Sequence, residues 1–147
     1  MRYLLPLGFG LLLLSGCAAP PQRAQPDSYN GDGLPLISRP PPVYQYFPEK
    51  QARLRHVGAV VLEYSVSANG RPEDIRAVDP SSAEFVTSAT RLVEFLRFKN
   101  PPNWVEQGGP TRRLRLQIVY NVTGLPPAKQ APGVETIVVT CDPGRRR

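Results

Sequence analysis

The chain has few of the residues on which most enzyme chemistry depends. It contains two cysteines, one histidine, one methionine and one tryptophan. Nothing in the sequence makes a serine or cysteine an obvious partner for His56, and neither a metal-ligand cluster nor a glycine-rich phosphate loop is present. Glu73 and Asp74 are adjacent, so in a strand they point to opposite faces and do not form an acid–base pair. We therefore expect no enzyme activity, no cofactor and no metal.

The apolar run near the N-terminus is too short to cross a bilayer. It extends from Leu4 to Leu14, about eleven residues, which is the length of a signal-peptide core, and it follows the positive Arg2. The run ends in Leu14-Ser15-Gly16-Cys17, which resembles a bacterial lipobox, in which the cysteine is acylated and becomes the first mature residue. We expect residues 1–16 to be a signal peptide and Cys17 to be lipidated. The alternative is an ordinary signal peptide with a chance cysteine.

A lipid on Cys17 would hold the protein on a membrane, since each buried methylene contributes about 0.8 kcal/mol. Ala18 stands where an inner-membrane retention signal would carry aspartate, so the resemblance implies a cell-envelope protein on the outer membrane, facing the periplasm. The segment 17–42 is rich in proline and poor in large apolar residues, which is typical of an extended tether. If Cys17 is a thioether, Cys141 has no partner within the chain and is expected to be a lone thiol.

The formal net charge of +6 raises the possibility of a nucleic-acid partner. The arginines, however, alternate with apolar residues and do not cluster beside aromatic ones. We expect no nucleic-acid binding, and instead a solvated basic face near anionic lipid or a negatively charged partner.

The central part of the chain predicts a small α+β domain over residues 43–123. From Val60 to Ser67 apolar and polar residues alternate as in a half-buried strand, and Asn69-Gly70 favours a tight hairpin with a weaker return strand. Ser81 as N-cap and Glu84 as its capping-box partner predict the start of a helix. Its apolar stripe is Phe85, Ala89, Leu92, Val93 and Leu96. Residues 113–122 alternate again, so we predict an antiparallel sheet of strand, strand, helix, strand order with the helix packed on one face.

Several short motifs together resemble the C-terminal domain of TonB and TonB-like proteins. They are Phe47-Pro48, Gly58 and the strand after it, Asn69-Gly70-Arg71-Pro72, the "RFKNP" after the helix, Gly109, and the final strand 113–122. The chain departs from the family at Phe47, where tyrosine is usual, and at Arg55 and Val57, where many members have glycine and glutamate. It also has a lipoprotein signal in place of the transmembrane helix of the energy transducers, so we do not expect it to transduce force.

The resemblance implies that the edge of the last strand accepts an extended peptide, the TonB box, by strand addition. The residues that match this partner-binding edge are Arg113, Arg115, Gln117 and Val119. The alternative is a final strand whose outward arginines only deter association.

The tail, residues 124–147, combines a proline-rich linker, a β-rich segment and a basic end. The segment resembles the TonB box itself: Glu135, Thr136, Ile137, Val138, Val139 and Thr140. Three interpretations of this segment are open: it pairs with the chain's own edge at 113–120, it binds a true TonB, or it is an ordinary fourth strand. The sequence therefore predicts a periplasmic binding lipoprotein whose partner is TonB, a TonB-dependent receptor or its own tail. The alternative is a structural or assembly lipoprotein of the envelope.

Overall fold

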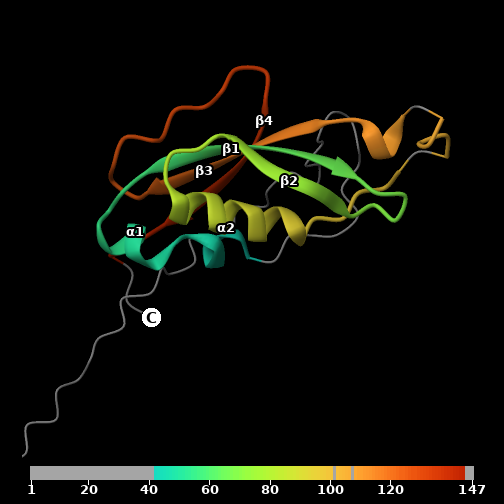
Figure 1. Cartoon of the computed structure of the whole chain (residues 1–147). Coiled ribbons are helices and arrows are strands. Elements are labelled where there is room, and N and C mark those ends of the chain that lie inside the picture. Colours follow the sequence, from blue (N-terminus) through green and yellow to red (C-terminus); the bar gives the residue numbers. More distant parts are fainter. Residues whose placement is uncertain (1–41, 101, 107, 145–147) are drawn as a thin grey trace, which may run out of the picture.

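The computed structural model describes residues 42–100, 102–106 and 108–144. Figure 1 shows a sheet with one main helix packed across one of its faces. In chain order the elements are η1 (Val43–Tyr46), α1 (Glu49–Arg53), β1 (Gly58–Val66), β2 (Pro72–Asp79), α2 (Ala83–Glu94), η2 (Gly109–Thr111), β3 (Leu114–Val122) and β4 (Glu135–Cys141). No helix among the described residues has the length and hydropathy needed to cross a membrane.

The strands lie in the order β2-β1-β3-β4. β1 is antiparallel to both β2 and β3, whereas β4 runs parallel to β3. The predicted α+β fold with one helix on one face is confirmed, but the sheet is mixed and not wholly antiparallel. The reason is the connection 123–134, which is long enough to return the chain to the end of the sheet at which β3 begins.

The hairpin between β1 and β2 is held by the segment that follows α2. Gly70 has φ +73°, and a Cβ added there would lie 2.1 Å from the carbonyl oxygen of Phe98. The N–H of Phe98 donates to the carbonyl of Gly70 at 2.9 Å, and the amide of Asn100 donates to the carbonyl of Ser67 at 2.7 Å. Glycine is therefore required at this turn both for its backbone angle and for the close approach of Phe98.

The predicted helix is present, but its cap lies one residue later than expected. Ser82, not Ser81, is the N-cap, and its hydroxyl accepts from the N–H of Phe85 at 3.4 Å. Glu84 then cannot complete a capping box, because it is the second residue of α2 and not the third. It instead forms an ion pair with Lys50 of α1 at 2.9 Å, and the hydrogen bond from Lys50 holds the pKa of Glu84 below its usual value. Every residue of the predicted apolar stripe is buried.

The core between α2 and the sheet contains two groups of aromatic rings. Phe85 and Tyr120 stack with centroids 4.6 Å apart, and Phe47 meets Tyr120 edge-on at 5.6 Å. Burial raises the pKa of Tyr120 above its usual range. The second group is the stacked pair of Tyr64 and Phe98. These ring contacts pack three parts against one another: the segment before α1, helix α2 and the sheet. The edges of the sheet therefore belong to a rigid body.

Candidate strand-pairing site

The TonB-box-like segment forms β4 and pairs with β3 of its own chain. The register runs without a shift from Leu116 opposite Glu135 to Val122 opposite Cys141. At the end of this ladder the N–H of Thr123 donates to the carbonyl of Cys141 at 2.9 Å. Ile137, Val139 and Cys141 are buried in the common core. Of the three alternatives for the tail, the structure shows pairing with the chain's own edge, as an integral fourth strand.

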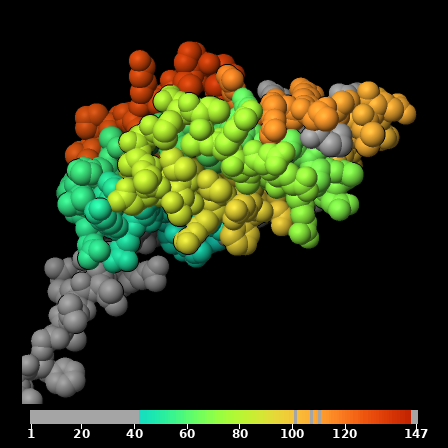
Figure 2. All heavy atoms as spheres, in the orientation of Figure 1, coloured from blue at the N-terminus to red at the C-terminus, as the bar shows by residue number. Residues whose placement is uncertain are grey.

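Two side chains of β3 hold the connection that leads to β4. The side-chain oxygen of Gln117 accepts from the N–H of Ala131 at 2.8 Å, and its amide nitrogen donates to the carbonyl of Lys129 at 3.2 Å. The side-chain oxygen of Asn121 accepts from the N–H of Ala128 at 2.9 Å. The connection 123–134 thus lies on the side of the sheet away from α2 (Figure 1) and forms a ridge along one border of the molecule (Figure 2).

The residues predicted to bind a partner are divided by this arrangement. Arg113 and Arg115 are exposed, whereas Gln117 and Val119 are buried beneath the connection. β4 occupies the edge of β3 from Leu116 onward. The structure therefore does not bring the four residues together at an open edge, and their binding role stays a prediction.

The face of the sheet away from α2 carries a row of charges across three strands. Glu63 of β1 lies opposite Arg76 of β2 and Arg115 of β3. Its carboxylate accepts from the Arg76 Nε at 3.1 Å and from the Arg115 Nε at 3.3 Å. The hydrogen bond from Arg76, together with that from Arg115, holds the pKa of Glu63 below its usual value. Arg113 meets Asp74 at 3.6 Å, so the three arginines of this face share two carboxylates.

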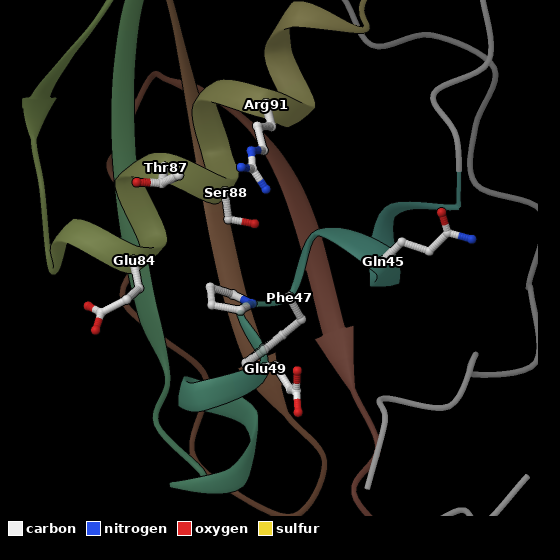
Figure 3. A pocket seen from close by; sticks show the side chains of 8 residues that line it. Gln45, Phe47, Glu49, Glu84, Thr87, Ser88 and Arg91 are labelled. Atoms are coloured by element: carbon white, nitrogen blue, oxygen red, sulfur yellow. The ribbon is translucent and has the colours of Figure 1, made fainter. Parts of the chain in front are cut away.

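A surface hollow opens between the segment that precedes α1 and helix α2 (Figure 3). Its polar lining includes Glu49, Glu84 and Arg91, and the hydroxyl of Ser88 in its wall donates to the carbonyl of Tyr46. In the part of the chain that the structure describes, no group of histidine, cysteine and carboxylate side chains could hold a metal ion. The lining offers no nucleophile paired with a base, so the hollow supports no catalytic proposal.

Cys141 differs from the expectation for a lipidated chain. It is buried at the end of β4 and is disulfide-bonded, not a lone thiol. The other cysteine of the chain, Cys17, lies outside the described residues, as do the signal peptide 1–16 and almost all of the tether 17–42. Lipidation of Cys17 and the role of the tether therefore stay predictions.

One comparison with known proteins gives a match. A family model described as the Gram-negative bacterial TonB protein C-terminal matches residues 43–122. No curated protein and no solved structure matches significantly. The match runs from η1 through the last residue of β3 and ends before β4, so the tail strand lies outside the matched region.

Proposed function

Because the chain belongs to the family of TonB C-terminal domains, we propose that it is a lipid-anchored binding protein of the cell envelope that pairs by strand addition with components of TonB-dependent transport. Domains of this family act in protein interaction. The partner is TonB or a TonB-dependent receptor. The proposal assigns no catalytic step to the chain.

The observation that carries this proposal is the parallel pairing of β4 with β3. It is an instance, within one molecule, of this sheet accepting an extended, β-branched segment along the edge of β3. In such pairing the backbone hydrogen bonds supply affinity, and the side chains that reach pockets supply selectivity. Here Ile137 and Val139 occupy the core positions, which defines the kind of side chain that a pairing segment must offer at alternate residues.

The anchor is proposed on separate grounds. The lipobox resemblance at Leu14 to Cys17 favours removal of residues 1–16 and acylation of Cys17. With Cys17 acylated, the disulfide of Cys141 has to join it to a cysteine of another molecule. Ala18 favours the outer membrane, with the domain facing the periplasm. The tether 17–42 then holds the domain at a distance from the membrane surface, where it can reach a partner.

A second candidate function follows from the same strand. β4 already occupies the edge of β3 and contributes three buried side chains to the core. A TonB box would have to displace it to use that edge. This favours a structural or assembly lipoprotein that holds another envelope component without taking part in transport.

Binding measurements separate the two functions. The full-length chain in detergent micelles is titrated with peptides that copy the TonB boxes of the transporters of the producing bacterium, and with the periplasmic part of its TonB. The transport role predicts saturable binding to one of these, which is lost when a central residue of the peptide is replaced by proline. If none binds while a different envelope protein forms a saturable complex, the scaffold function replaces the transport role.

A further inference from the structure

The two edges of the sheet are built differently. The edge strand β2 begins with Pro72, has a left-handed residue at Asp74 with φ +50°, and is out of register with β1 at two places. It also carries several charged side chains: Glu73, Asp74, Arg76 and Asp79. Proline, bulges and charges on an edge strand are the usual protection against pairing with another chain. The edge at β2 is therefore closed to strand addition.

The edge at β4 has only one of these protections, the charge of Glu135 at its first residue. From Thr136 to Cys141 the strand has no charge, no proline and no glycine, and its residues are almost all β-branched. Its register with β3 has no shift. An edge strand of this composition is a template for a further strand, and the contrast with β2 indicates that pairing is avoided at one edge only.

The direction of the backbone groups of β4 follows from a single bond. The carbonyl of Cys141 accepts from Thr123, so it faces β3. Because backbone direction alternates along a strand, the N–H and C=O groups of Thr136, Val138 and Thr140 face the outer side. Within the described residues, no hydrogen bond uses these backbone groups.

Apolar side chains border β4 on the side of α2. η1 contacts β4, and its Tyr46 meets Phe95 edge-on with ring centroids 6.0 Å apart. Phe95 is 55% exposed, although it is a large apolar residue beside the core. A strand added next to β4 would place every second side chain on this side of the sheet. Apolar residues at those positions would lie on the side where η1 contacts β4.

We propose that the outer edge of β4, at Thr136, Val138 and Thr140, accepts an uncharged extended segment of a partner protein as a fifth strand. The proposal rests on the proposed function, binding by strand addition, but it places the acceptor on β4 and not on β3. Displacement of β4 would expose the buried Ile137 and Val139 and break the hydrogen bonds of Gln117 to the connection. Addition outside β4 requires neither.

Amide hydrogen exchange read by NMR tests this on the full-length chain in detergent micelles. The probe is a synthetic peptide that copies residues 134–142 with serine in place of Cys141, because it is an extended and uncharged strand of known sequence. In the free chain the amides of Thr136, Val138 and Thr140 should exchange fast, and those of Ile137 and Val139 slowly. On binding, the first three should become protected while the other two stay unchanged.

Several outcomes would overturn the proposal. Protection of all five amides in the free chain would mean that another part of the chain covers the edge. Faster exchange at Ile137 and Val139 on binding would mean displacement of β4, which overturns the outer-edge site but keeps binding by strand addition. No binding at millimolar probe would remove the site, whereas the TonB-box titrations would still decide the proposed function. A dimer that forms without probe and protects the same amides would make the occupant a second copy.

The variant Val138→Pro removes one outward N–H and no bond to β3. Proline is tolerated on an edge strand at such a position, so the unfolding temperature should stay close to that of the wild type. Affinity for the probe should fall severalfold, up to about tenfold, the effect of one lost hydrogen bond. Val139→Pro is the matched control, because its N–H faces β3 and its loss should detach β4.

N-methylation of the probe keeps the test independent of protein folding. The methyl group removes one N–H of the peptide and leaves the chain intact. Methylation of the peptide N–H groups that face β4 should abolish binding. Methylation of the alternate N–H groups, which face away, should leave binding nearly unchanged. Equal effects of the two sets of methyl groups would show that the probe does not bind as a strand.

Discussion

The side-chain oxygen of Gln117 accepts a hydrogen bond from the backbone N–H of Ala131 at 2.8 Å. This bond joins the middle of β3 to the proline-rich connection that precedes β4. The same oxygen also accepts from the hydroxyl of Thr136 at 3.4 Å, at the start of β4. The position of the tail strand therefore depends on a buried side chain of β3 as well as on the backbone ladder.

Replacement of this side chain should loosen the tail. For Gln117→Ala we expect the free energy of unfolding to fall by about 1–2 kcal/mol, since two part-buried hydrogen bonds, to the N–H of Ala131 and the C=O of Lys129, are lost. Urea titration measures the loss, and hydrogen exchange should show the β4 amides opening before those of β1. Gln130→Ala is the control, because Gln130 is the same residue type and is exposed on the same connection. Equal stabilities of the two variants would contradict a holding role for Gln117.

A pair of glycines separates backbone strain from steric contact. Gly70 and Gly133 have nearly equal backbone angles, φ +73° and +72°, but only Gly70 has a neighbour within reach of an added Cβ. Gly133→Ala should cost about 1 kcal/mol, from the left-handed angle alone. Gly70→Ala adds the contact with the carbonyl of Phe98 and should cost clearly more, at least about 3 kcal/mol. Thermal unfolding measures both, and similar losses would mean that the segment after α2 moves away freely.

The sequence predicts the strands and the helix of the central domain because each has a strong apolar period. Alternation identifies β1 and β3, and the stripe on α2 has helical spacing. The cap was misplaced because Ser81 and Ser82 are adjacent and both suit an N-cap. Only the backbone geometry, with Ser82 extended at φ −153°, selects between them.

The arrangement of the site is harder to predict. The sequence of the β-rich tail does not indicate whether the strand runs parallel or antiparallel to β3, because side chains alternate in the same way in both kinds of pair. The direction depends on the path of the connection, which Gln117 and Asn121 determine through contacts distant in sequence. Arg55 has a left-handed backbone, φ +54°, at a position where the family resemblance implies glycine in many members. This angle was not predicted from the sequence.

Glu63 should make stability depend on pH in acid. Its pKa is lower in the folded chain than in the unfolded one, because Arg76 and then Arg115 donate to it. Its contribution is therefore fully present above the unfolded value, about 4.3, and is lost as the pH falls through the lowered folded value. Glu63→Gln should be less stable than the wild type at pH 7, with the difference shrinking in acid. The midpoints of urea unfolding, compared between variant and wild type at pH 7 and in acid, measure this difference in stability.

The matched control for that experiment is Glu73→Gln, on the neighbouring strand β2. Glu73 is exposed, so its replacement should leave both the midpoint at pH 7 and the acid dependence nearly unchanged. An equal loss of acid dependence in the two variants would show that general charge, and not the pairing across three strands, sets the response.

Lipidation makes a prediction about both cysteines. A thioether uses the sulfur of Cys17, so a lipidated Cys17 cannot be the disulfide partner of Cys141. In membranes of the producing bacterium, mass spectrometry should find a mature chain that begins at an acylated Cys17. Cys17→Ser should lose the acyl mass and leave the membrane fraction, whereas Cys141→Ser should keep both. A digest without reductant that contains a peptide joining Cys17 to Cys141, in a chain without acyl groups, would contradict the anchor. The tether would then lie along the domain and not between it and the membrane.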